Sequence, residues 1–165
     1  MSTAVLGIGS NLGDRRAHLQ SVVDALGPWL VAVSPVYESP PWGPVEQPAY
    51  LNAVLIVTDP AADADTWLDR AQAVEAAAGR TRDVRWGPRT LDVDILSVDT
   101  EVRVNPSLTL PHPRAAQRAF VLVPWLAVDP RARVPARGPV ADLLVRLPVE
   151  EIAHVVARPE LSLAR

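Results

Sequence analysis

Residues 4–27, AVLGIGSNLGDRRAHLQSVVDALG, contain the pattern that sets the fold. The segment from Ala4 to Gly9 is short and apolar, which is typical of a buried strand. Turn and helix N-cap residues follow at 10–14. Apolar residues then recur at helical spacing, at Leu19, Val22, Val23 and Leu26, and Gly27-Pro28 ends the run. The stretch therefore predicts a strand, a turn and a helix.

The same order continues along the chain. Residues 29–37 and 50–58 are rich in β-branched and aromatic side chains and predict the second and third strands. Residues 64–78 have helical spacing, and 91–96 (LDVDIL) predict a fourth strand. A short strand near 101–104 and helices over 119–128 and 140–147 are expected beyond it. This order predicts an α+β fold, a ferredoxin-like α/β sandwich with a mainly antiparallel sheet, two main helices packed on it and a helical C-terminal addition.

A proline-rich loop separates the second and third strands. Prolines at 35, 40, 41, 44 and 48 prevent regular structure there, because proline lacks the N–H that helices and sheets use. The loop is stiff, and it is long enough to be functional.

Composition narrows the class of protein. The 165 residues, 48% of them hydrophobic, fit one domain over 1–165. Because there is no cysteine, a thiol nucleophile and a Cys-based zinc site are excluded. A net charge of −3 argues against a nucleic-acid partner. Neither a leader peptide nor a membrane-spanning helix is predicted, so we expect a cytoplasmic protein with no membrane partner. A monomer is also expected.

Asp92-Val93-Asp94 is the strongest local chemical signal. On a strand, residues two apart share a face, so both carboxylates project together while Leu91, Val93 and Ile95 face the apolar side. Two carboxylates suit Mg²⁺, which takes its other ligands from water and phosphate. A solvated polar strand end is the alternative interpretation of the same pair.

Arginines near this pair favour the magnesium interpretation over that alternative. All sixteen basic residues of the chain are arginine, and Arg80, Arg82, Arg85 and Arg89 precede Asp92 closely. Guanidinium groups around a magnesium pair match the needs of a triphosphate, because they bind phosphate oxygens in a bidentate way. A loop of solvent-exposed arginines that bind no ligand is the alternative interpretation.

Flat and amide side chains form a second group. Tyr50 and Asn52 share a strand face, while Trp42, Trp86 and Phe120 lie in or beside loops. Such groups suit a planar heterocycle held between rings. His112, between two prolines, is either a phosphate contact or a surface histidine. The P-loop, Rossmann and α/β-hydrolase signatures are absent.

Four stretches together resemble the 6-hydroxymethyl-7,8-dihydropterin pyrophosphokinase family of the folate pathway. They are GIGSNLGDR at 7–15, SPPWGPVEQPAYLNAV at 39–54, GRTRDVRWGPRTLDVDIL at 79–96 and LPHPRAAQRAFVLVPW at 110–125. The resemblance covers about residues 3–150, and the tail 151–165 has no signature. It implies transfer of pyrophosphate from ATP to the pterin hydroxymethyl group with release of AMP.

The resemblance also implies residue roles. Asp92 and Asp94 would hold two Mg²⁺ ions, and Arg80, Arg82 and Arg89 would reach the phosphates. ATP would be bound by Gln72, Glu75, Ile95, Thr109, His112 and Arg118. The pterin would contact Ser39, Pro40, Trp42, Tyr50, Asn52, Trp86 and Phe120. Ala115, Ala116 and Gln117 depart from the charged residues that many members have before the arginine at 118.

Two rival classes remain open at this point. RNA-recognition domains also use a ferredoxin-like sheet, but they stack bases on central-strand aromatics, and AVLGIG has none. A metal-dependent phosphohydrolase would want more carboxylate or histidine ligands than this segment provides. The products separate the three: AMP from the transferase, inorganic phosphate from a hydrolase, neither from a binding module.

Overall fold

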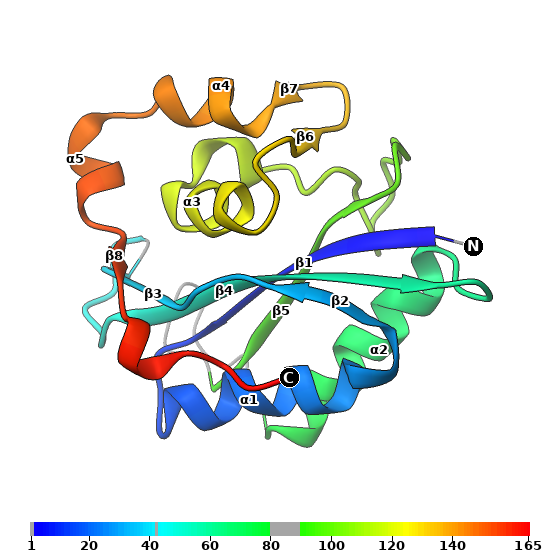
Figure 1. Ribbon diagram of the computed structural model, residues 1–165, viewed down its shortest axis with the longest axis horizontal. Helices are drawn as coiled ribbons and strands as arrows, with labels where there is room; N and C mark the ends of the chain where they lie inside the picture. The colour runs from blue at the N-terminus through cyan, green and yellow to red at the C-terminus, as the bar shows by residue number, and fades with distance from the viewer. Residues whose placement is uncertain (1, 42, 80–89) are drawn as a thin grey trace.

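The computed structural model describes residues 2–41, 43–79 and 90–165. It has three layers, with one sheet between two layers of helices (Figure 1). The main sheet has the order β5-β1-β4-β3-β8, with β2 also paired to β4, and all these pairs are antiparallel. Its strands are β1 (Ser2–Ser10), β2 (Leu30–Val33), β3 (Tyr37–Ser39), β4 (Tyr50–Asp59), β5 (Asp92–Val98) and β8 (Val156–Ala157). The expected ferredoxin-like α+β sandwich is confirmed.

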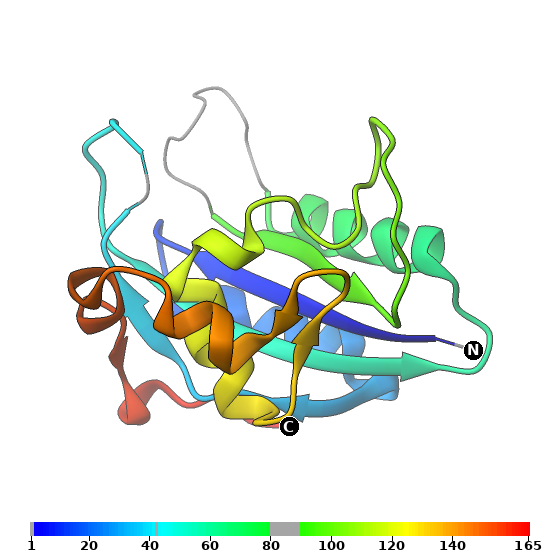
Figure 2. The ribbon, with the colours of Figure 1, turned by 90° about the horizontal axis from the view of Figure 1, so that it is seen from above.

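Helices cover both faces of the sheet, as Figures 1 and 2 show. One face carries α1 (Arg15–Leu26) and α2 (Ala64–Ala77). The other carries α3 (Ala119–Val128) and α4 (Val140–Val145), with the small hairpin of β6 (Arg133–Val134) and β7 (Gly138–Pro139) beside them. Among the described residues, no helix is long and apolar enough to cross a membrane.

Alternation along β1 divides the core into two clusters. Ala4, Leu6 and Ile8 belong to the cluster that includes the α1 side chains Leu19 and Val22. The opposite face of the sheet contributes Val54 and Leu96 to a second cluster around Trp125 of α3. Val5 of β1 also packs against this second cluster, so this strand contributes side chains to both layers, because successive strand residues point to opposite faces.

The second predicted strand is interrupted. The sequence favoured one strand over 29–37, but Trp29 ends a 3₁₀ turn (Gly27–Trp29), and β2 and β3 pair separately with β4. Pro35 lacks an N–H, so the ladder cannot pass through it. The break is closed by Ser34: its N–H donates to Val54 O (2.9 Å), and its hydroxyl oxygen accepts from the Val54 N–H (2.8 Å).

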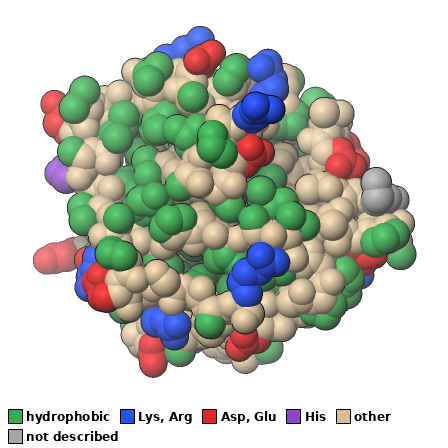
Figure 3. All heavy atoms as spheres, in the orientation of Figure 1, with side chains coloured by type: hydrophobic (Ala, Val, Ile, Leu, Met, Phe, Trp, Pro, Cys, Tyr) green, Lys and Arg blue, Asp and Glu red, His purple; other side chains and the backbone are tan. Residues whose placement is uncertain are grey.

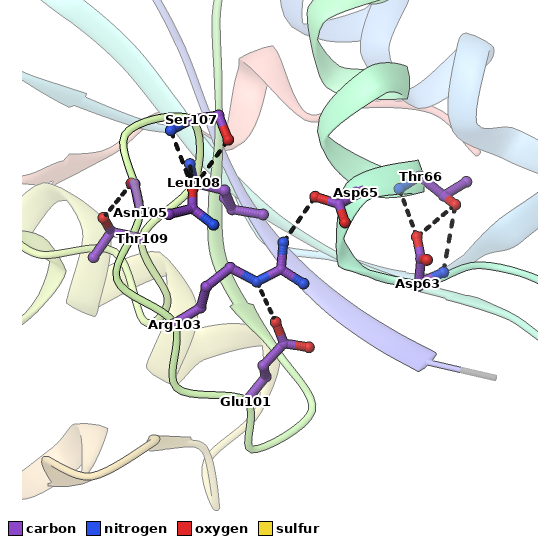
Figure 4. Close-up of polar contacts among 9 residues, drawn as sticks. All are labelled: Asp63, Asp65, Thr66, Glu101, Arg103, Asn105, Ser107, Leu108 and Thr109. Carbon is purple, nitrogen blue, oxygen red and sulfur yellow. Dashed lines mark hydrogen bonds and ion pairs between the residues drawn. The ribbon is translucent and has the colours of Figure 1, made fainter.

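The expected strand near 101–104 is reduced to a single bridge between Arg103 and Leu110. Arg103 instead pairs with Asp65 (2.7 Å) at the start of α2 and with Glu101 (2.7 Å) (Figure 4). Nearby, Asp63 and Thr66 form a capping box at the α2 N-terminus. These contacts fasten the loop after β5 to α2, and the loop leads to His112.

The C-terminal tail is part of the sheet. After α5 (Val149–Ala153), β8 pairs with β3, and Arg158 Nη1 lies 2.8 Å from Glu38 Oε1. The chain then follows α1, where the Gln20 side chain exchanges two hydrogen bonds with Ala164 (2.6 and 2.8 Å). The sequence indicated no role for 151–165, and the structure gives it one in covering β3 and α1.

Candidate active site

A cavity of about 260 Å³ lies on the α3 face of the sheet. Its floor comes from β1, β4 and β5, and its walls come from the start of the proline-rich loop, the segment at His112 and the N-terminal part of α3. The cavity brings together nine residues that the sequence singled out: Ser39, Pro40, Tyr50, Asn52, Asp92, Asp94, His112, Arg118 and Phe120. These nine residues come from three separate stretches of sequence, 39–54, 79–96 and 110–125, and Gly7 and Gly9 add the stretch 7–15 to the same cavity.

Strand register explains how the polar side chains meet. Gly9 of β1 pairs with Asn52 of β4 on one side and with Asp92 of β5 on the other. Two pairs further along, Gly7 lies opposite Asp94. Directly paired residues share a face, so the two carboxylates and the amide point to the same side of the sheet. The predicted common face of Asp92 and Asp94, and that of Tyr50 and Asn52, are confirmed.

Gly7 and Gly9 also line the cavity, and the sequence interpretation did not single them out. A Cβ on Gly7 would lie 3.3 Å from Leu96 Cδ2, and one on Gly9 would lie 3.4 Å from both Asn52 Oδ1 and Tyr50 Cδ1. The central strand therefore presents bare backbone between the aspartates and Asn52. The signal was the Gly-x-Gly spacing, since glycine inside a strand often marks a close approach of a ligand.

The amide side of the cavity is well ordered. Asn52 Nδ2 donates to Ser39 Oγ at 2.7 Å, and both side chains are buried. This bond fixes the rotation of the Asn52 amide beside Tyr50. Phe120 lines the same cavity from α3, and the Arg118 guanidinium lies 5.5 Å from its ring centroid. Aromatic surface and an oriented amide are what a planar, polar heterocycle requires.

His112 is held as a neutral donor. The Arg114 N–H donates to His112 Nδ1 (3.2 Å), so the proton of the neutral ring lies on Nε2. Burial lowers the pKa of His112 to about 4, and the charges of Arg118 and Arg114 act in the same direction. Burial also lowers the pKa of Arg118, an effect that Asp94 and Asp92 oppose. Arg118 stays cationic, because arginine is not deprotonated in proteins.

The carboxylate pair is suited to a hard divalent cation. Within 2–41, 43–79 and 90–165, no group of three or more His, Asp or Glu side chains is placed to hold a metal. A cation at Asp92 and Asp94 would take its other ligands from water and substrate oxygens, which is how Mg²⁺ is usually bound. The residues present therefore fit magnesium better than a metal that needs a cage of protein ligands.

Four predicted ATP contacts lie outside this cavity lining: Gln72, Glu75, Ile95 and Thr109. Gln72 is exposed on α2, while Glu75 is buried and accepts the Val93 N–H at 3.1 Å. Thr109 donates to Asn105 O (3.3 Å) in the loop of Figure 4. Five further predicted residues lie outside the described part of the chain: Trp42, Arg80, Arg82, Trp86 and Arg89.

Comparisons with known proteins show the family to which this chain is similar. A family model described as 7,8-dihydro-6-hydroxymethylpterin-pyrophosphokinase (HPPK) matches residues 5–130. The 2-amino-4-hydroxy-6-hydroxymethyldihydropteridine pyrophosphokinase of Mycobacterium tuberculosis is 50% identical over an alignment 177 residues long. The alignment covers 99% of this chain and 94% of that protein. The Pseudomonas aeruginosa protein of the same name is 42% identical over 152 residues, with 90% and 93% covered.

Among solved structures, wild-type Plasmodium falciparum HPPK-DHPS with pteroate has a TM-score of 0.68 at 11% identity. The match covers 88% of this chain but only 44% of that one, so the chain spans less than half of the solved protein and shares its fold over that part. Taken with the family match and the curated relatives, the chain belongs to the 7,8-dihydro-6-hydroxymethylpterin-pyrophosphokinase family and is an enzyme of the transferase class.

Proposed function

We propose that this protein transfers the β,γ-pyrophosphoryl group of ATP to the hydroxymethyl oxygen of 6-hydroxymethyl-7,8-dihydropterin, releasing AMP. The oxygen attacks the β-phosphorus, the bond from that phosphorus to the α,β-bridging oxygen breaks, and the hydroxyl proton leaves the oxygen. The observation that carries the proposal is the shared cavity, in which the oriented Asn52 amide and the Asp92–Asp94 pair flank one bare strand.

The pterin is proposed to lie over Gly7 and Gly9, between Tyr50 and Phe120. The Asn52 amide, fixed by Ser39, would then pair with the polar edge of the ring. A heterocycle with both donors and acceptors is favoured here, because an unmatched buried amide is costly. Trp42 and Trp86 remain predicted contacts that would complete this end of the site.

The triphosphate is proposed to lie beside Asp92 and Asp94. These two aspartates would hold two Mg²⁺ ions, which supply neutralisation of the phosphate charge when bound. His112 donates from Nε2 and Arg118 from its guanidinium toward phosphate oxygens, and both line the cavity. Arg80, Arg82 and Arg89 are proposed as further phosphate donors. Gln72, Glu75, Ile95 and Thr109 remain predicted adenine contacts.

Proton removal from the hydroxymethyl group is assigned to Asp92. It lines the cavity opposite Gly9, in the same cross-strand row as Asn52, so it is the carboxylate nearer to the proposed pterin position. A carboxylate there would orient the hydroxyl and accept its proton as the new bond to phosphorus forms.

An RNA-binding role is disfavoured by the layers of the molecule. Base stacking needs an open sheet face, whereas α1 and α2 cover one face and α3 and α4 lie over the other (Figure 1). On the face seen in Figure 3, basic and acidic side chains are interspersed rather than gathered into one basic patch.

The test is chromatography of the protein with Mg²⁺, ATP and 6-hydroxymethyl-7,8-dihydropterin, with a control that lacks the pterin. We expect AMP only when the pterin is present. Inorganic phosphate without AMP would instead indicate a hydrolase.

The carboxylate assignment is tested by replacing Asp92 and Asp94 together by alanine. We expect a folded protein that forms no AMP, because the two proposed Mg²⁺ ions lose the aspartates that would hold them. Asp142→Ala on α4, which removes an exposed carboxylate away from the cavity, is the control and should keep full activity. Full turnover by the double variant would refute the metal assignment.

A further inference from the structure

We propose that Asn11 is a positioning residue for the pterin end of the cavity. The inference rests on the function proposed above, and it concerns the residues that hold the end of the proline-rich loop. Asn11 is not part of the cavity lining, yet its side chain is 1% exposed and bonded to that loop.

Asn11 directly follows the last residue of β1 that pairs with β4. The register of β1 and β4 finishes with Ser10 opposite Leu51. Beyond that pair, the segment after β1 turns into α1, and the segment before Tyr50 of β4 is the proline-rich loop. Backbone pairing can therefore no longer fix residues 47–49, although these residues lead directly into the cavity wall.

The side-chain amide of Asn11 holds residues 47–48 in place of backbone pairing. Its Nδ2 donates to Gln47 Oε1 at 2.8 Å and to Pro48 O at 2.9 Å. Both amide hydrogens are thus used in a fully buried position, where an unsatisfied group would be costly. Pro48 has no N–H of its own to anchor it, so its carbonyl is the main-chain group through which it can be held.

Arg15 reinforces the same segment. Its Nη1 donates to Ala49 O at 3.1 Å and to Glu38 Oε2 at 2.6 Å. Two consecutive carbonyls, those of Pro48 and Ala49, are therefore held by side chains from the turn after β1 and the start of α1. Glu38 lies on β3 beside Ser39, so Arg15 ties together the two ends of the loop.

The consequence reaches the cavity through two residues. Tyr50 and Asn52 follow the anchored segment directly, and Ser39, the hydrogen-bond partner of Asn52, precedes the loop. Because the loop is rich in proline, it has few N–H groups for internal hydrogen bonds and depends on these outside donors. Release of residues 47–49 is expected to loosen the pterin wall and to leave the phosphate side unchanged.

The decisive variant is Asn11→Asp, which keeps the shape and replaces the two donors by an acceptor facing two acceptors. We expect the KM for the pterin to rise about tenfold, with the KM for ATP and kcat changed less than about twofold. A merely structural role would lower the melting temperature and the active fraction without moving the pterin KM. Pterin binding is also titrated directly by fluorescence, with a non-transferable ATP analogue and Mg²⁺ present.

A second variant keeps the test decisive if Asn11→Asp does not fold. Gln47→Met keeps the side-chain length on a half-exposed loop position and removes one of the two acceptors. A pterin KM raised about threefold is expected. The matched control is Gln20→Met, which removes an amide that also clamps backbone, at Ala164 on the far side of α1. Its pterin KM should equal that of the unaltered protein.

The outcomes separate the two proposals. An unchanged pterin KM and affinity in Asn11→Asp and Gln47→Met would overturn the positioning role. An unaltered protein that forms no pterin-dependent AMP would overturn the proposed reaction instead, and the fluorescence titration would still compare pterin binding in the variants.

Discussion

His112 shows how one partly buried side chain links the site to stability. Its pKa is about 4 in the folded protein against 6.5 when unperturbed, chiefly through burial. The unfolded chain therefore binds more protons between these values. The neutral ring contributes stability that is fully present above pH 6.5 and is lost as the pH falls toward 4.

We expect the free energy of unfolding to fall by about 3 kcal/mol from this residue between pH 8 and pH 4. Urea denaturation of the protein and of His112→Gln across this range measures the difference. His154→Gln, at an exposed histidine, is the control and should leave the slope unchanged. Parallel pH profiles for the protein and His112→Gln would contradict the assignment.

A substitution at Gly9 tests pterin binding separately from the stability of strand β1. We expect Gly9→Val to remain folded, because valine favours strands, but to lose pterin affinity at least about a hundredfold. The Cβ of the valine would itself lie 3.4 Å from Asn52 Oδ1, and its methyl groups would extend further into the cavity. Fluorescence titration and the melting temperature measure the two effects. Gly27→Ala, whose Cβ would meet no atom within 4 Å, should bind normally. Normal affinity in Gly9→Val would show that the ligand does not approach this strand.

At the scale of elements, the break between β2 and β3 depends on one hydroxyl. Ser34 is buried and bonds both the Val54 N–H and Pro35 O (2.8 Å each). Ser34→Ala should lower the free energy of unfolding by about 1–3 kcal/mol, because the Val54 N–H loses its acceptor. Denaturant titration measures this, with the exposed Ser21→Ala as the control. A change as small as that of the control would mean that the hydroxyl has no such role.

Periodicity was enough to predict the long elements. The four apolar residues of α1 are all buried, and β4 and α2 lie within a residue or two of their expected bounds. The break at Ser34 could not be predicted in the same way, because a side chain replaces a ladder partner only where a distant strand supplies Val54. The Asp92–Asp94 face was predictable from strand alternation, whereas His112 is placed beside it by a long-range contact, the hydrogen bond from the His112 N–H to Leu96 O (2.9 Å).

At the scale of the whole molecule, the tail closes the sheet edge at β3. Removal of residues 155–165 deletes β8, the Arg158–Glu38 pair and the packing of Leu161 and Leu163 on the core. We expect the melting temperature to fall by at least about 5 °C, because partly buried leucines alone contribute about a kcal/mol or more each. Calorimetry measures it.

Val104→Ala, at a side chain 85% exposed, is the control for this measurement and should melt as the unaltered protein does. A truncated protein with an unchanged melting temperature would mean that the tail lies on the sheet without stabilising it.

The bare backbone of β1 has a further consequence for inhibitors. A compound resting on Gly7 and Gly9 touches main-chain atoms, which no codon change can take away. A substitution at either glycine can only add atoms, and those atoms would occupy the space in which the pterin is proposed to lie. Drug resistance arising at this floor would therefore reduce the enzyme's own turnover together with the binding of the compound.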